Sequence, residues 1–546
     1  MFIINFLKKN LIACLIFISA LFFLIYLRFD NTPPHWDAGR HYYNSSKYWE
    51  WLNTIFTNKY TNVRLDAAVA FFRSYLYYPP FVYWISLPFQ AFFGSTYQAS
   101  LASNFVWILT LGTFANLWLK RLSFDKIPRF IALAFLLGSP FIIGQSREFQ
   151  VDLPLLSMLI VTFWSAEKLL QKFDFKNVAL FSFIFRFGLM TKWSFGLFVL
   201  PIIGLYAARF IYLVKKYRQV SFSDISFAVY TLVLSIFGIC SLWYLPNIVR
   251  LKLDLFQNSQ TAGLNEGDPQ GLTIESFIFY VKVIVNEYLW LPWLLFFAVI
   301  FGFAILTIFK QKDKIKSYLV LNKFSFAILL SVFNFVLMYL YLMKQGNKDT
   351  RYAIILYPSL IVFLAICSQI LVRLNRMKAL RYISLVAGVV CIANLLNLSL
   401  PLGNQNIILA ENSSFPITVV GATGYTNTRI KDQDWGIYKA LEKAKSLKNV
   451  YIDRDDSCVG KTPWYTRPSI GVDFDPQPLH TNFGTVWGLS EEYGLQIADT
   501  EKPCFILIGR STSFDKIDTT KYDKEYHLVS ENSDWQGFNN KLMMKK

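Results

Sequence analysis

Residues 10–40 read NLIACLIFISALFFLIYLRFDNTPPHWDAGR, an apolar run that ends abruptly in a polar segment. The apolar part, about Asn10 to Leu27, is long enough to cross the roughly 30 Å of hydrocarbon in a bilayer. It is too long for a typical signal-peptide core and lacks a convincing cleavage site, so we expect a retained membrane helix. The polar part places Asp37 and Arg40 just beyond the end of that helix.

Further apolar runs bring the expected number of spans to about eleven. They lie near residues 98–119, 130–146, 151–167, 178–191, 193–213, 225–247, 289–309, 324–343, 352–372 and 382–400. The chain is 54% hydrophobic and 16% charged, whereas soluble domains carry about 25% charged residues. The sequence therefore predicts an all-α polytopic membrane domain over residues 1–401.

The net charge of +18 does not indicate nucleic-acid binding, because the basic residues form short clusters between apolar runs. Such clusters are typical of topology signals and contacts with membrane lipid. With a cytoplasmic N-terminus, basic residues are about three times as dense in the cytoplasmic segments as in the outer ones. We therefore expect a multi-pass protein of the cell (inner) membrane with its N-terminus in the cytoplasm.

The apolar stretch YYPPFVYWISLPFQAFFG at 77–94 is long enough to cross the membrane but contains Pro79, Pro80 and Pro88. Counting it as a span would place the later basic clusters outside. We interpret it instead as a helix at the outer surface, within one long loop from 28 to 97. Such a loop would roof a cavity, because non-spanning backbone at membrane depth needs protein or water around it.

From residue 402 the composition becomes polar, and 402–546 is expected to form an extracytoplasmic α/β domain. KNVYIDRD (448–455) and PCFILIGRS (503–511) have strand patterns, and DWGIYKALEKAKSL (434–447) has helical spacing. Cys458 and Cys504 lie in this region and could form a disulfide outside the cytoplasm.

Ionisable residues that interrupt apolar context fall mainly at the outer ends of spans, where they are costly unless they pair or face water. They are Asp37, Arg40, Arg147, Asp152 and Lys192, and Arg351 with Tyr352 beside it in KQGNKDTRY. A carboxylate there can act as a general base on a hydroxyl group, and the cations can hold a departing phosphate. Structural interpretations stay open, since Asp37 and Asp152 could cap helices and Arg147 could extend to the interface.

The sequence indicates no cofactor with certainty. His35 and His41 flank Asp37, but two histidines without further ligands are weak evidence for a metal site. We assign no metal ligand, and a divalent metal stays open.

Five motifs resemble the GT-C superfamily of membrane glycosyltransferases, closest to the protein O-mannosyltransferase-like branch that includes the lipid A aminoarabinose transferases. They are WDAGRHY (36–42), YYPP (77–80) with FG at 93–94, SREFQVDLPL (146–155), GLMTKWS (188–194) and DTRYAIILYP (349–358). Their order and spacing cover about residues 1–400.

The resemblance implies a GT-C fold and an inverting transfer from a sugar on undecaprenyl or dolichyl phosphate. It implies Asp37 as the catalytic base, with Arg40, Asp152 and Lys192 at the donor. The acceptor could be a glycolipid, a polysaccharide or a protein. The chain departs from the family where Ala38 follows Asp37 and where Tyr78 precedes the paired prolines.

Two alternative functions stay open at this point. A transporter or flippase for a lipid-linked glycan would show related halves and polar groups near mid-membrane, whereas here the polar groups cluster at one face. An oligosaccharide ligase would also use an outer cavity, but the modest loop at 248–288 favours transfer of a single sugar.

Overall fold

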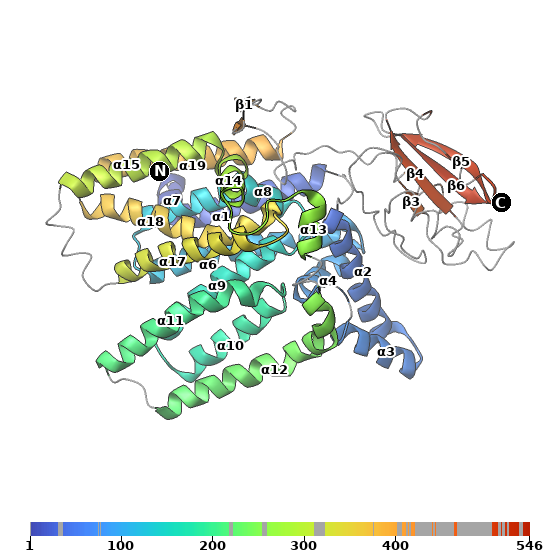
Figure 1. The fold of residues 1–546 in the computed structure, drawn as a ribbon, viewed down its shortest axis with the longest axis horizontal. Helices are drawn as coiled ribbons and strands as arrows, with labels where there is room; N and C mark the ends of the chain where they lie inside the picture. The colour runs from blue at the N-terminus through green and yellow to red at the C-terminus, as the bar shows by residue number, and fades with distance from the viewer. Residues whose placement is uncertain are drawn as a thin grey trace.

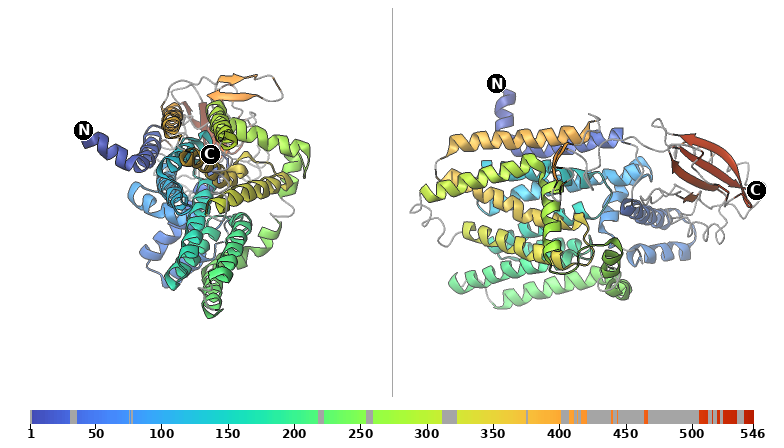
Figure 2. Two further views of the ribbon diagram at one scale, coloured as in Figure 1. Left: turned by 90° about the vertical axis from the view of Figure 1, so that its left-hand side faces the viewer. Right: turned by 45° about the horizontal axis from the view of Figure 1, so that its top comes forward.

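A bundle of long helices with an outlying sheet makes up the computed structural model (Figure 1). The structure describes residues 2–30, 36–74, 76, 78–217, 222–253, 259–310, 323–374 and 376–400, with 407–410, 413, 416–420, 439, 443, 464–466, 505–511, 515, 519–520, 523–533 and 539–546. Most of the long helices run side by side in the right view of Figure 2, and the left view looks along the bundle.

Among the described residues, eight segments are helical, long and apolar enough to cross a membrane, and a bent helix pair makes up to nine. The chain is thus a multi-pass membrane protein, as predicted. The helices concerned are α1 (Phe2–Phe29), α5 (Tyr97–Ala102) with α6 (Asn104–Arg121), the bent pair α7 (Lys126–Gly138) and α8 (Pro140–Ser146), α9 (Asp152–Gln171), α11 (Phe195–Tyr217), α14 (Ile274–Val283) with η2 (Ile284–Leu289) and α15 (Trp290–Lys310), α17 (Lys323–Lys344), η3 (Thr350–Leu356) with α18 (Tyr357–Arg373), and α19 (Met377–Ser399).

The two remaining predicted spans correspond to α10 (Phe175–Leu189) and α12 (Phe222–Leu253). Helix α10 lies between α9 and α12 in Figure 1, parallel to both. Its 15 residues extend only about 22 Å, less than the hydrocarbon thickness, which explains why length alone does not mark it as a span.

The 77–94 stretch does not form a span of membrane length, as its prolines predict. It forms α4 (Phe81–Phe93), which begins directly after Pro80 and lies at the bundle end beside α2 (Trp36–Thr57), α3 (Thr61–Phe72) and α13 (Ser259–Glu266) (Figure 1). A hydrogen bond from the Phe81 N–H to the Met190 carbonyl (3.0 Å) fixes its start against the turn after α10. The side chains of Ser45 and Ser86 (2.5 Å) join α2 to α4.

The bend between α7 and α8 is 56° and determines where the chain enters α9. The Gly138 carbonyl at the bend accepts hydrogen bonds from the Trp293 indole (3.1 Å) and the Asn394 amide (2.8 Å). A Cβ at Gly138 would stand 2.6 Å from the Cα of Cys391, so only glycine lets α7 and α19 approach this closely. These contacts at Gly138 hold the bend in place, and with it the start of the segment that carries Arg147 and Asp152.

The C-terminal region contains two sheets. Strands β1 (Ile407–Leu409) and β2 (Ile417–Val420) pair antiparallel, and Asn286 on η2 accepts the Thr418 N–H (2.9 Å). The second sheet has the order β3 (Trp464–Thr466), β4 (Phe505–Ser511), β6 (Asn539–Lys545) and β5 (Tyr526–Ser533), with β3 and β4 parallel and the other pairs antiparallel. Strand β4 confirms the strand predicted at 503–511. The 448–455 strand and the Cys458–Cys504 pair lie outside the described residues, as does the 434–447 helix apart from isolated positions.

Candidate active site

Asp37 lies in the first turn of α2, at the same bundle end as α4. A carboxylate is favoured at a helix N-terminus because the backbone N–H groups there carry partial positive charge. The Asp37 side chain is 28% exposed, so one part faces protein and another is accessible from outside. This is the position that a general base needs, since the proton donor must be able to reach it.

Arg351 is the main partner of Asp37. Its Nη1 lies 2.8 Å from one carboxylate oxygen, and the Arg40 Nη1 lies 3.9 Å from the other. Burial alone would raise the pKa of the Asp37 carboxyl, but the positive charges, chiefly Arg351, lower it from 3.8 to about 2. Asp37 is therefore ionised throughout the physiological pH range.

The Arg351 guanidinium is anchored by Asp349. The Asp349 carboxylate accepts from the Arg351 Nε (2.7 Å) and Nη2 (2.5 Å), and it also accepts the Arg351 backbone N–H (2.9 Å) as the cap of η3. Gln150, between α8 and α9, accepts from the same Nη1 that faces Asp37 (3.1 Å). Only 11% of the Arg351 side chain is exposed, so this cation has a fixed position.

A second ion pair joins Asp152, in the first turn of α9, to Lys192 in the turn between α10 and α11. The Lys192 Nζ lies 2.7 Å from the carboxylate, and the side chains are only 6% and 2% exposed. The same ammonium lies 5.4 Å from the centre of the Tyr352 ring. Since Tyr352 follows Arg351 and is in electrostatic range of both Asp37 and Asp152, the two ion pairs form one polar cluster.

His41, one turn after Asp37 on α2, is buried and acts as a scaffold rather than a base. Burial lowers its pKa to about 3, so the ring is neutral at physiological pH. Its Nδ1 lies 2.8 Å from the hydroxyl oxygen of Tyr83 on α4, and the Asn44 amide donates to the same hydroxyl (3.1 Å). These bonds hold α2, and with it Asp37, against α4.

The structure does not bring Arg147 into this cluster. Its guanidinium donates to the Leu398 carbonyl and to the Ser399 hydroxyl (2.5 Å) at the end of α19, and it lies 4.6 Å from the Tyr26 ring centre on α1. These contacts indicate a structural connection among three helices. The sequence predicted Arg147 beside Asp152 because both lie in the outer turn between two spans, but in the structure the two side chains have different partners.

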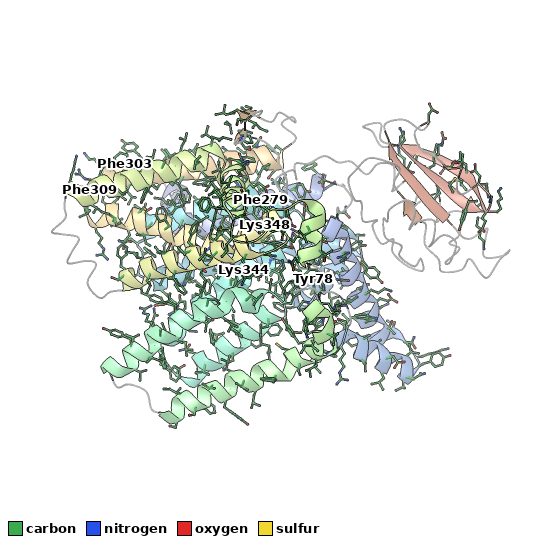
Figure 3. All side chains as sticks on the ribbon, in the orientation of Figure 1. Tyr78, Phe279, Phe303, Phe309, Lys344 and Lys348 are labelled. Carbon is green, nitrogen blue, oxygen red and sulfur yellow. The ribbon has the colours of Figure 1, made fainter. Side chains whose placement is uncertain are left out.

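Tyr78, labelled in Figure 3, lies just before the start of α4. Its ring packs at a tilted angle on that of His41, with ring centroids 4.7 Å apart. Lys348, also labelled in Figure 3, is buried and donates from its Nζ to the carbonyls of Met343 (2.7 Å) and Gln345 at the end of α17. It closes that helix, as a terminal lysine commonly does.

A metal does not fit the residues seen at this site. In the described part of the chain, no three His, Cys, Asp or Glu side chains come close enough to hold an ion. The carboxylates of Asp37 and Asp152 face Arg351 and Lys192 instead. We therefore derive no step through a metal.

A cavity of about 690 Å³ lies at the opposite end of the bundle, between α9, α11 and α17. Its charged residues, Glu167 and Arg209, pair with each other at 3.0 Å. None of the predicted site residues lines this cavity.

Comparison with solved structures identifies the class of fold. Nearly the whole chain matches ArnT from Cupriavidus metallidurans in the apo state, with TM-score 0.57, 12% identity and 98% of each chain covered. The same protein bound to undecaprenyl phosphate matches with TM-score 0.53, 11% identity and the same coverage. The fold is therefore the GT-C fold, as the five motifs predicted.

A family model described as dolichyl-phosphate-mannose-protein mannosyltransferase matches residues 78–243. That range includes α4, Asp152 and Lys192. Comparison with curated proteins gives no match. The chain is thus confirmed as similar to the GT-C superfamily of membrane glycosyltransferases, in fold over nearly its whole length and by the family model over residues 78–243.

Proposed function

We propose that the chain transfers a single sugar from a polyprenyl-phosphate carrier to an acceptor outside the cytoplasm, with Asp37 as the general base. The observation that carries this proposal is the polar cluster of Asp37, Arg351, Asp152 and Lys192 at one end of a GT-C bundle. It combines an accessible carboxylate with cations able to bind phosphate. A solved structure of this fold bound to undecaprenyl phosphate supports a donor of that class.

The reaction is a single displacement. Asp37 accepts the proton of the acceptor hydroxyl while the hydroxyl oxygen attacks the anomeric carbon of the sugar. The bond from that carbon to the phosphate oxygen breaks on the opposite face, which inverts the anomeric centre. The phosphate leaves with its lipid, and Arg351, Arg40 and Lys192 stabilise its negative charge.

The orientation follows from the basic segments. The adjoining ends of α6 and α7 at the opposite bundle end carry Lys120, Arg121, Lys126 and Arg129, which favours a cytoplasmic location for that end. The active site and the 402–546 domain would then face outward, where flipped carrier lipids present their sugars. Glycolipid, polysaccharide and protein acceptors all fit this arrangement.

Asp37→Asn tests the proposal, because it keeps the side-chain volume and removes the base. Membranes supplied with polyprenyl-phosphate sugar should lose transfer by about 10²–10⁴-fold, the usual worth of a general base. Glu50→Gln is the matched control, since it removes an exposed carboxylate from the same helix about 20 Å away. Full activity of Asp37→Asn would exclude the mechanism, and movement of glycolipid across vesicles without a new glycosidic bond would favour a transporter.

A further inference from the structure

The Arg351 guanidinium contacts two carboxylates, those of Asp37 and Asp349. Asp349 holds the guanidinium through Nε (2.7 Å) and Nη2 (2.5 Å), whereas Asp37 meets the remaining nitrogen, Nη1, at 2.8 Å. A phosphate prefers two parallel N–H donors of an arginine. At Nη1 it therefore competes with Asp37 for the guanidinium.

Of the two acceptors, Asp37 is the one that can give way. Asp349 is two residues from Arg351, makes three hydrogen bonds with it and caps η3. Asp37 comes from a different segment, is more exposed than Asp349 (28% against 16%) and shares Nη1 with Gln150.

The charges of the cluster also indicate that Asp37 is the group that leaves Arg351. The ion pairs of the cluster join three carboxylates to three cations: Asp37, Asp152, Asp349, Arg40, Lys192 and Arg351. A donor phosphate adds negative charge. The Arg40 side chain, 46% exposed and 3.9 Å from Asp37, can meet it directly, whereas Arg351 can add a contact through Nη1 only if Asp37 moves away. Lys192 is the less available cation, because its pair with Asp152 is almost fully buried.

We infer that Arg351 is a switch that holds Asp37 in the donor-free protein and releases it when the donor phosphate binds. Asp349 is the positioning residue that keeps the guanidinium in place in both states. This inference rests on the proposed function and adds regulation to it: the carboxylate becomes a free base only when the donor is present. Burial, which opposes the ionisation of Asp37, then raises its pKa once the phosphate has replaced Asp37 at Arg351.

The switch predicts an unusual effect of removing the base. In purified protein in lipid nanodiscs, Asp37→Asn should bind undecaprenyl phosphate more tightly than the unmodified chain, by about three- to tenfold, because the phosphate no longer competes for Arg351. The same variant should not transfer sugar. Glu50→Gln should bind with unchanged affinity, since its carboxylate pairs with Lys47 at 2.8 Å on the surface of α2.

Asp349→Asn separates positioning from folding, because asparagine still caps η3 but no longer carries charge. Its affinity for undecaprenyl phosphate should fall by about three- to tenfold while the protein remains folded. Arg351→Ala should lose more affinity than Asp349→Asn.

The outcomes separate this inference from the proposed function. If the protein binds undecaprenyl phosphate and Asp37→Asn binds it equally or less tightly, the switch is wrong and the transferase proposal stands. If neither the unmodified chain nor any variant binds it, both are overturned.

Discussion

The buried pair of Asp152 and Lys192 allows a quantitative test of the cluster. Lys192→Met keeps most of the stem that packs near Tyr352 but leaves the Asp152 carboxylate, 2% exposed, without its cation at 2.7 Å. Removing one partner of a buried pair costs about 3–5 kcal/mol. That is a large part of the 5–15 kcal/mol by which proteins are typically stable.

The double variant Asp152→Asn with Lys192→Met removes both charges, so it should recover to within about 1 kcal/mol of the unmodified chain. Unfolding of the detergent-solubilised protein, followed by tryptophan fluorescence, measures the four free energies of the cycle. Transfer activity should stay low in the double variant, because the ammonium proposed to stabilise the departing phosphate is missing. Stability and activity therefore respond differently.

The exposed pair of Lys47 and Glu50, at 33% and 60% exposure, is the control. Lys47→Met should cost only about 0–1 kcal/mol. A cost for Lys192→Met no larger than this would refute the reasoning. So would a double variant as unstable as the single ones, since the loss would then not come from an unpaired charge.

Three further predictions concern pH, packing and orientation. Arg351 lowers the pKa of Asp37 to about 2 in the donor-free protein. The fall of kcat/KM on acidification that this group causes should therefore lie near pH 2. The corresponding fall of kcat, which reports the donor-bound state, should lie at higher pH. Gly138→Ala should destabilise the chain by about 1–3 kcal/mol, because its Cβ would meet the backbone of α19 at 2.6 Å, whereas Gly204→Ala has open space and should be tolerated in the same unfolding assay. In a cysteine-free background, Lys59→Cys should react with an impermeant thiol reagent in intact cells and Lys176→Cys only after permeabilisation, and the reverse pattern would overturn the proposed orientation.

Hydropathy and proline placement predicted most of the bundle. The surface helix α4 followed from Pro79 and Pro80, since an internal pair of prolines is unfavourable in a span. The 56° bend at α7–α8 was not predicted, because it depends on contacts that Gly138 makes with Trp293 and Asn394, far away in the sequence. The π-helical turn η2 also gave no signal in the sequence.

The candidate site was predictable as a set of residues but not as a set of pairs. Charged groups at helix ends identify Asp37, Asp152, Lys192 and Arg351, because each needs a partner or water there. Which carboxylate faces which cation depends on how helices pack. Asp349 was part of the predicted polar loop, but no role was predicted for it. Its position two residues before Arg351, where an aspartate can cap a turn, was the sequence feature that could have indicated its contact with Arg351.

The ion pair of Asp37 and Arg351 also bears on how the protein is made. Asp37 emerges from the ribosome after the first membrane helix, whereas Arg351 precedes α18, the second-to-last long helix of the bundle. During most of synthesis the carboxylate therefore has no arginine from η3 beside it, and the donor has no anchored guanidinium to bind. On the proposed mechanism, a nascent chain that has inserted most of its helices still lacks the Arg351 contact and is expected to be inactive.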